Sequence, residues 1–332
     1  MQRFALIGAG FIGSLHARNL FRHPGVSLEV IADIDADKAV SLAKQYQTRP
    51  ASIDEVFASD VDAVLIASST ATHAEYVERA ANAGKAIYCE KPIDLSTQRA
   101  EQAVAAVREA KVPFMIGFNR RFDESHAALK EAMMAGEIGR VELVQMTCRS
   151  QATPPMEYIK TSGGQMHDQA IHFFDLLCWL TNDEPVEIHV FGGALSDQKI
   201  GQLGDVDTSI ITLRMASGAL AQIDCTRRTG YGYDERIELF GSEGMAESRR
   251  QPSRHLSVYR GKHERRDGLD DDWLARIETS FSNGLNAFVR GLEGEDVSYP
   301  NVTSALRAQS IADAAARSLQ IGERVAIAGQ IT

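Results

Sequence analysis

The length, composition and charge of the chain exclude several classes of protein. Its 332 residues are 44% hydrophobic and 24% charged, as in an ordinary globular protein of about two domains, so a disordered, collagenous or coiled-coil chain is excluded. The net charge of -10 disfavours non-specific binding to nucleic acid or to an anionic membrane. The four cysteines are scattered and no apolar run approaches the ~20 residues of a membrane span, so we expect a cytoplasmic protein.

Short apolar runs alternate with helical segments in the first part of the chain. The sequence predicts strands at residues 4–7, 28–32, 61–67, 86–89 and 113–117, and helices at residues 12–21, 37–46, 73–83 and 96–110. Apolar strands that alternate with helices indicate a parallel sheet with both faces covered, and right-handed crossovers make the sheet doubly wound. We therefore predict an α/β Rossmann domain over residues 1–120.

The pattern changes after residue 120. Apolar and polar residues alternate with a period of two at residues 141–147, 186–191, 208–214, 219–226 and 236–240, and helices are predicted at residues 123–135, 166–180, 272–290 and 302–319. This alternation, broken by Gly and Asp turns, is typical of an antiparallel sheet. We predict a second α/β domain over residues 121–332, in which the polar stretch 248–272 is the least structured part.

A glycine-rich turn follows the first strand and opens the first helix. Gly8-Ala9-Gly10-Phe11-Ile12-Gly13 is a G-x-G-x-x-G motif, whose glycines allow a tight turn, a close approach of the backbone to a pyrophosphate and close packing of helix on strand. Asp33 ends the second strand, where a carboxylate accepts hydrogen bonds from ribose hydroxyls and repels a 2′-phosphate, which favours NAD over NADP. The alternative is a structural glycine turn without a ligand.

Glu90-Lys91-Pro92 follows the fourth strand. Residues at the carboxyl ends of strands face the ligand crevice of a doubly wound sheet, where the charge of Lys91 would stabilise a developing alkoxide. Taken alone, a surface lysine before a proline turn is the simpler interpretation.

One predicted helix of the second domain carries a histidine between carboxylates. Asp168, His172 and Asp175 are spaced at i, i+4 and i+7 and therefore share a helix face. A carboxylate beside an imidazole suits a general base that removes a hydroxyl proton. The same spacing also fits a buried polar network, a metal site, or an Asp that only favours the start of the helix.

Together these motifs resemble the glucose–fructose oxidoreductase/inositol dehydrogenase (Gfo/Idh/MocA) family over nearly the whole chain. The shared motifs are GAGFIG with Asp33, the run from Ala67 to His73, Glu90-Lys91-Pro92 and GGQMHDQAIHFFD. Within the family the inositol dehydrogenase subgroup is similar at GFNRRFD and at Tyr231-Gly232-Tyr233-Asp234.

The resemblance implies an open, mainly antiparallel sheet in the second domain, and NAD-dependent oxidation of an unphosphorylated cyclic polyol, first of all myo-inositol to its 2-ketone. It implies Lys91, Asp168 and His172 as catalytic residues and no metal. It also implies two binding sets. The cofactor set is Gly8, Gly10, Phe11, Ile12, Gly13, Asp33, Ser68, Thr70, His73, Glu90 and Lys91, and the substrate set is Lys91, Asn119, Arg120, Gln151, Asp168, His172, Tyr231 and Tyr233.

Other functions remain open at this stage. Phe173 and Ser150 stand where inositol dehydrogenases often carry other residues, so another inositol isomer or an aldopyranose is an alternative substrate. A non-catalytic NAD-binding regulator and a metal-dependent hydrolase or lyase are more remote alternatives. The resemblance also points to a homotetramer that is formed through the face of the second sheet that helices leave uncovered.

Overall fold

The computed structural model describes residues 1–327, and the chain forms two compact units. Unit 1 contains Met1–Asn119 and Ser280–Arg307, and unit 2 contains Arg120–Thr279 and the described residues from Ala308 onward. Among the residues described, none of the helices is both long and apolar enough to cross a membrane.

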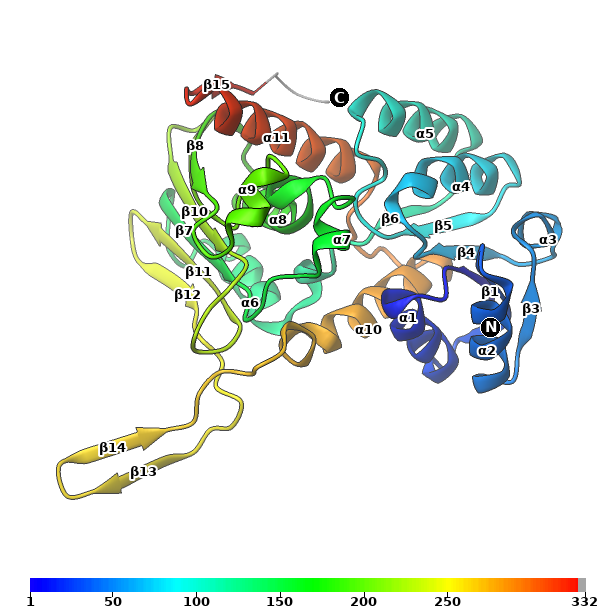
Figure 1. Cartoon of the computed structure of the whole chain (residues 1–332), viewed down its shortest axis with the longest axis horizontal. Helices are drawn as coiled ribbons and strands as arrows, with labels where there is room; N and C mark the ends of the chain where they lie inside the picture. The colour runs from blue at the N-terminus through cyan, green and yellow to red at the C-terminus, as the bar shows by residue number, and fades with distance from the viewer. Residues whose placement is uncertain (328–332) are drawn as a thin grey trace. The chain divides into compact units, whose positions relative to one another are not determined.

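Unit 1 is built on a six-stranded parallel sheet (Figure 1). Its strands are β1 (Gln2–Ile7), β2 (Val26–Ala32), β3 (Arg49–Ala51), β4 (Ala63–Ile66), β5 (Ala86–Cys89) and β6 (Phe114–Ile116). They pair in the order β3-β2-β1-β4-β5-β6, which is the order of a dinucleotide-binding Rossmann sheet. Every residue of β4, β5 and β6 is buried, as expected for a sheet covered on both faces.

The helices of unit 1 begin where the sequence supplies caps. They are α1 (Phe11–Arg22), α2 (Ala36–Gln45), α3 (Ile53–Ala58), α4 (Thr70–Asn82) and α5 (Thr97–Ala110). The Asp35 carboxylate accepts backbone N–H groups at the start of α2, and Ser52 with Glu55 forms a capping box at the start of α3. The sequence pattern did not indicate α3 or β3, because both are short and largely exposed.

The chain returns to unit 1 near its end. Helix α10 (Trp273–Leu292) crosses from unit 2 into unit 1, and α11 (Val302–Ile321) crosses back. The buried ring of Phe288 on α10 packs edge-on against Phe4 of β1 and Tyr88 of β5, with ring centroids 6.3 and 5.8 Å apart. Residues 280–307 therefore complete the apolar core of unit 1.

Unit 2 is built on a seven-stranded mixed sheet. Its strands are β7 (Val141–Arg149), β8 (Pro185–Gly193), β9 (Thr208–Met215), β10 (Leu220–Thr226), β11 (Asp234–Gly241), β12 (Met245–Ser248) and β15 (Val325–Ala326). They pair in the order β12-β11-β7-β10-β9-β8-β15, and all pairs are antiparallel except β7 with β10. The sheet is therefore mainly antiparallel, which confirms the prediction for the second domain.

Helices cover one face of this sheet. They include α6 (Glu124–Met134), α7 (Met156–Ile159), a π-helical turn (Met166–Ala170), α8 (Ile171–Thr181) and α9 (Gln198–Gln202), and a 3₁₀ turn (Asn119–Phe122) precedes them. The α8 helix is buried almost throughout and contacts β7. On the opposite side, Ile210, Leu220 and Phe240 are each nearly half exposed. We call this side the open face.

The segment between β12 and α10 forms a hairpin of β13 (Ser257–Arg260) and β14 (His263–Arg266). The prediction that residues 248–272 are the least structured part is wrong for these two strands. All of their residues are exposed, so the sequence has no alternation of apolar and polar residues to reveal them.

Candidate functional site

Four predicted cofactor segments lie at one edge of the sheet of unit 1. Gly8 follows β1, Asp33 follows β2, Ser68 comes shortly after β4, and Glu90 follows β5. Because these strands are parallel and adjacent in the order β2-β1-β4-β5, their carboxyl ends meet at the same edge. The sheet therefore brings together Gly8 and Glu90, which are 82 positions apart in the sequence.

The glycine turn leaves room for an anionic group at the start of α1. A Cβ on Gly8 would lie 2.4 Å from the Ala67 carbonyl oxygen, and one on Gly13 would lie 1.9 Å from the Gly8 carbonyl oxygen, so the packing itself requires both glycines. A Cβ on Gly10 would meet nothing within 4 Å. No side chain caps α1 and its first turn holds no acidic residue, so its positive end suits a pyrophosphate. The residues present therefore fit NAD.

Asp33 joins the glycine turn to the end of β2. Its Oδ2 accepts a hydrogen bond from the Ala9 N–H at 2.7 Å, and its Oδ1 accepts one from the Asp35 N–H at 2.8 Å. The carboxylate is thus held in a fixed orientation beside the turn. Each oxygen keeps a second lone pair, which is the acceptor that a ribose hydroxyl requires.

Ser68, Thr70 and His73 surround the start of α4. The Ser68 hydroxyl lies 2.7 Å from the Thr72 hydroxyl, and Thr70 is the first residue of the helix. His73 is buried, with Nδ1 2.8 Å from the Pro92 carbonyl oxygen and Nε2 3.0 Å from the Ser68 carbonyl oxygen. Burial lowers the pKa of His73, so the neutral ring donates to one of the two carbonyls and ties the loops after β4 and β5 together.

Glu90 and Lys91 are held by a histidine that the sequence pattern did not indicate. Buried His16 of α1 places its Nε2 2.8 Å from Glu90 Oε1, and Glu90 Oε2 accepts the Lys91 N–H at 3.3 Å. A Cβ on Gly117 would lie only 2.8 Å from that same Oε2, so the glycine makes space for the carboxylate. The Lys91 side chain is partly exposed beside this buried pair.

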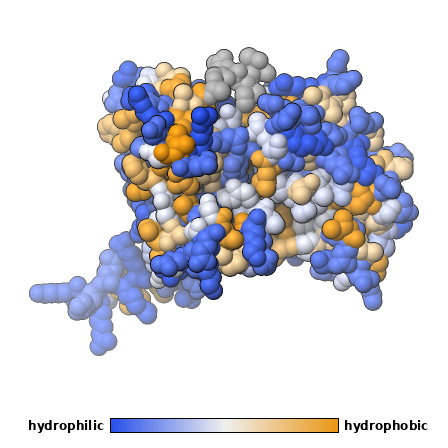
Figure 2. All heavy atoms as spheres, turned by 45° about the horizontal axis from the view of Figure 1, so that its top comes forward, coloured by the Kyte–Doolittle hydropathy of each residue, from blue (hydrophilic) through white to orange (hydrophobic). Residues whose placement is uncertain are grey.

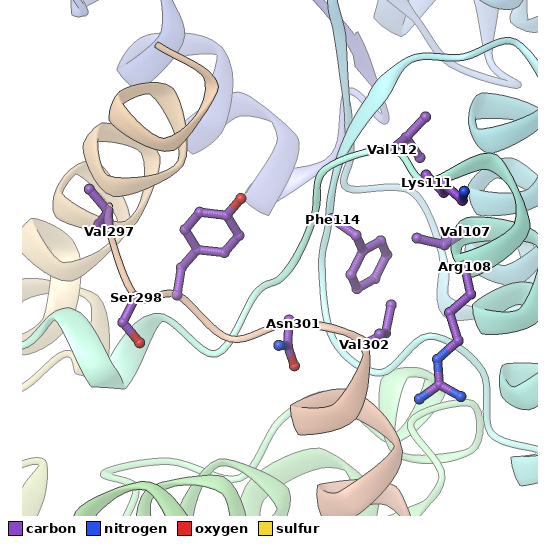
Figure 3. A pocket seen from close by; sticks show the side chains of 10 residues that line it. Val107, Arg108, Lys111, Val112, Phe114, Val297, Ser298, Asn301 and Val302 are labelled. Carbon is purple, nitrogen blue, oxygen red and sulfur yellow. The ribbon is translucent and has the colours of Figure 1, made fainter. Parts of the chain in front are cut away.

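A pocket of about 510 Å³ lies elsewhere in unit 1. Figure 3 shows Phe114 with Val107 and Arg108 on one side and Asn301 on the other. Phe114 is the first residue of β6, so the pocket lies at the amino end of that strand, opposite the edge that holds the glycine turn. None of the predicted site residues lines it.

The predicted catalytic residues of unit 2 lie near the ends of the parallel pair β7 and β10. Arg149 and Thr226 end these strands in register, and the Ser150 N–H donates to the Thr226 carbonyl oxygen at 2.9 Å. The Gln169 side chain, from the π-helical turn, donates to Ser150 Oγ and to the Thr226 carbonyl oxygen. The turn that carries Asp168 is therefore fixed at this edge.

Asp168 and His172 belong to adjoining helical turns, whereas Asp175 is engaged elsewhere. Asp168 lies in the π-helical turn, and His172 lies in the first turn of α8 and is buried. Asp175 accepts both forks of the Arg121 guanidinium, and both side chains are buried. Asp175 therefore forms a structural ion pair and does not extend the face that the spacing suggests.

Asp168 is held by Tyr158 and Arg227, neither of which is among the predicted site residues. Its Oδ1 accepts the Tyr158 hydroxyl at 2.7 Å, and its Oδ2 accepts Arg227 Nη1 at 3.1 Å. Buried Arg227 also lies 3.6 Å from Asp205, so one cation faces two carboxylates. With one guanidinium and two carboxylates, the cluster carries a net negative charge.

Two predicted substrate residues lie in a buried ion network. Arg120 donates through Nε to Glu235 at 3.0 Å and through Nη2 to the Tyr233 hydroxyl at 3.2 Å, and Tyr233 donates to Glu235. All three residues are buried. Burial alone would raise the pKa of Glu235, but Arg120, His126 and Arg276 lower it below its usual value.

The other predicted substrate residues occupy three separate places. Asn119 donates to Ser280 Oγ at 2.7 Å within unit 1. Tyr231 is 44% exposed and hydrogen-bonds to Asp234 and Arg149. Gln151 follows β7, and its Oε1 is buried with no hydrogen-bond partner among residues 1–327. Among these three residues, Gln151 is the one with a buried side-chain acceptor that no described residue satisfies.

The fold and the glycine edge define a class of oxidoreductase with an NAD-binding Rossmann fold. Residues 2–118 match the family model described as "Oxidoreductase family, NAD-binding Rossmann fold", and residues 126–247 match the "GFO/IDH/MocA C-terminal domain". The chain belongs to the GFO/IDH/MocA family of oxidoreductases, which confirms the family, the fold class and the NAD cofactor inferred from the sequence.

Relatives match this chain over most of its length. It is 38% identical to "Inositol 2-dehydrogenase" of Rhizobium meliloti over 98% of this chain and 99% of that protein. It is 34% identical to "scyllo-inositol 2-dehydrogenase (NAD(+))" of Bacillus subtilis over 86% of this chain and 84% of that protein. The solved structure of a myo-inositol dehydrogenase from Corynebacterium glutamicum is 33% identical, superposes with a TM-score of 0.93 and covers 99% of both chains.

Proposed function

We propose that this protein oxidises one ring hydroxyl of an inositol to a ketone, with NAD as the electron acceptor and myo-inositol as the first candidate. The observation that carries the proposal is the buried imidazole of His172 one helical turn from an Asp168 carboxylate that Arg227 and Tyr158 hold. The names of relatives that match nearly the whole chain support the same substrate class.

Each catalytic residue has a distinct task in this proposal. His172 removes the hydroxyl proton, and the anionic cluster around Asp168 stabilises the imidazolium that forms. The Lys91 ammonium stabilises negative charge on the substrate oxygen as the C–H bond breaks. NAD, when bound, supplies the carbon that accepts the hydride.

The cofactor residues divide into two groups. The amides at the start of α1, from Gly10 through Phe11 and Ile12, bind the pyrophosphate, and Asp33 accepts the ribose hydroxyls. Ser68, Thr70 and Glu90-Lys91 line the same edge. We assign His73 the positioning of this edge, because both of its ring nitrogens face backbone carbonyl oxygens.

Substrate recognition rests on polar groups at the β7–β10 edge. We propose that the buried Oε1 of Gln151 accepts a ring hydroxyl, and that Asn119, Arg120 and Tyr233 act by holding the surrounding backbone in place. An unphosphorylated ring suits such a site, because a phosphate would require a cluster of basic side chains.

We further propose a cytoplasmic homotetramer. The open face supports the assembly, since Ile210, Leu220 and Phe240 lie exposed on three strands of one sheet, β9, β10 and β11. The sparse, scattered cysteines support the location. Multi-angle light scattering at micromolar concentration tests the assembly, and a monomer at that concentration would refute it.

The substrate proposal is tested by NADH formation with a panel of compounds. We expect kcat/KM for myo-inositol or scyllo-inositol to exceed that for glucose, inositol phosphate and a linear 2-hydroxy acid by at least about tenfold, or ~1.4 kcal/mol in transition-state binding. A higher value for a phosphorylated or linear compound would exclude the neutral-ring proposal. NAD binding without turnover of any compound would favour the regulator.

A further inference from the structure

A basic hairpin projects from unit 2. Every residue from Ser253 to Arg266 is exposed, and we call this segment the arm. Figure 1 shows β13 and β14 standing clear of the seven-stranded sheet, and Figure 2 shows the arm as a hydrophilic projection. A two-stranded hairpin alone is at best marginally stable in water. The arm therefore suits contact with another surface.

The charge of the arm is opposite to that of the rest of the chain. It contains five basic side chains and one acidic one, a net charge of +4, whereas the whole chain carries -10, so the remainder carries -14. The basic residues are Arg254, Arg260, Lys262, Arg265 and Arg266. The rest of another copy of the same chain is therefore an electrostatic partner for the arm.

The strand register divides the arm into two faces. Val258 lies opposite Arg265, and Arg260 lies opposite His263, so these four side chains share what we call the Val258 face. Neither Arg260 nor Arg265 forms an ion pair with a residue that the structure describes. On the other face, Glu264 pairs with Arg266. The Val258 face thus combines an apolar side chain with uncompensated positive charge.

The open face carries a pair of acidic side chains that could bind the basic residues of the arm. Glu238 of β11 lies directly opposite Glu247 of β12, and like charges in this position destabilise a strand pair. Glu247 pairs with Arg249, whereas Glu238 has no basic partner in the described part of the chain. The arm begins five residues after β12 ends, so the basic arm and the acidic pair adjoin the same sheet edge.

We propose that the Val258 face of the arm docks on a second copy of this chain, where Arg260 and Arg265 meet Glu238 and Glu247 of the open face. In a twofold pair each copy supplies one arm and receives one. The inference rests on the proposed self-association. It adds that the arm contacts the second copy, and that ion pairs between the arm and the open face stabilise this contact.

Charge reversal on the arm provides the test. In sedimentation velocity, the double variant Arg260→Glu/Arg265→Glu should raise the dissociation constant of the assembly at least tenfold, which corresponds to ~1.4 kcal/mol. Glu238→Lys should also raise the dissociation constant of the assembly. The matched control Glu264→Arg/Arg266→Glu exchanges a pair on the opposite face, keeps the net charge and should leave the assembly unchanged. A photo-reactive residue at position 258 should yield a covalent dimer of the chain.

Several outcomes would overturn the docking. The double variant could assemble like the unaltered chain, or the crosslinker could capture no second copy. Binding of the arm to vesicles of anionic phospholipid or to duplex DNA by a monomeric chain would identify a different occupant. If Ile210→Lys dissociated the assembly while the arm variants did not, self-association would stand and arm docking would fall. The proposed oxidation is measured separately by NADH formation, so either proposal can fail alone.

Discussion

Asp168 lies in a cluster where one buried guanidinium faces two carboxylates, and this excess of negative charge is the basis of a prediction about Arg227. Arg227→Met removes the cation, so protonation of His172, the proposed general base, becomes easier. We expect the acid limb of the kcat/KM profile to move to higher pH by about one unit. Arg227→Lys keeps the charge and should restore part of the profile.

The matched control for this variant is Arg228→Met, because Arg228 is the adjacent residue and is exposed. It should leave the pH profile unchanged. A merely structural role for Arg227 would lower activity equally at every pH, and that result would contradict the assignment.

His172 gives the second prediction at this scale. His172→Ala should lower kcat at neutral pH by the ~10²–10⁴ that is typical of losing a general base, while NAD binding is retained. His167→Gln is the control, because His167 lies in the same segment but its Nε2 faces Asp313 at 2.7 Å. A near-normal kcat for His172→Ala, measured by NADH absorbance, would remove His172 from the mechanism.

At the level of elements, we predict two different roles for the glycines of the turn: Gly13 is required for packing, and Gly10 is required for ligand binding. Gly13→Ala would place a Cβ 1.9 Å from the Gly8 carbonyl oxygen, so we expect a loss of ~1–3 kcal/mol in the free energy of unfolding. Gly10→Ala meets no atom within 4 Å and should leave the stability nearly unchanged. It should nevertheless raise the Kd for NAD by about tenfold or more, since the backbone can no longer approach the pyrophosphate.

Urea-induced unfolding and calorimetric titration with NAD test this pair of variants. Equal loss of stability in both would mean that Gly10 is also a packing residue. Unchanged NAD affinity in Gly10→Ala would place the pyrophosphate away from the turn.

The elements that could be predicted from the sequence are those with a local pattern of apolar residues or a local motif. The strands β1, β4 and β5 are uninterrupted apolar runs because both sheet faces are covered, and Gly8 to Gly13 is a local signature. No local pattern indicates His16 or Arg227, because their partners, Glu90 and Asp168, lie 74 and 59 positions away. Such pairing depends on the tertiary fold, which no local pattern contains.

For the whole molecule, the buried network around Glu235 predicts how stability depends on pH. Burial opposes ionisation, but Arg120 and its neighbours lower the pKa of Glu235, and Arg276 likewise lowers the pKa of Asp123. A carboxyl group with a lowered pKa stabilises the fold above its unfolded pKa, and this contribution is lost as the pH falls. We therefore expect the free energy of unfolding to decline below about pH 4.5.

Glu235→Gln should cost about 3–5 kcal/mol at pH 7, because it leaves the buried Arg120 without its counter-charge. The free energy of unfolding of the Glu235→Gln variant should also fall less steeply on acidification than that of the unaltered chain. Glu101→Gln, at an exposed position on α5, is the control and should change stability little. A steep acid limb that survives in Glu235→Gln would assign it to other carboxylates.

The path of the chain between its units has a consequence for synthesis. The described chain passes from one unit to the other three times, between residues 119 and 120, 279 and 280, and 307 and 308. Phe288, whose ring packs on Phe4 of β1 and Tyr88 of β5, leaves the ribosome long after both of these strands. In the nascent chain, Phe4 and Tyr88 therefore lack this packing partner until nearly the whole polypeptide has been translated. Ribosome-bound fragments that end before residue 280 should bind chaperones, and those that extend past residue 307 should release them.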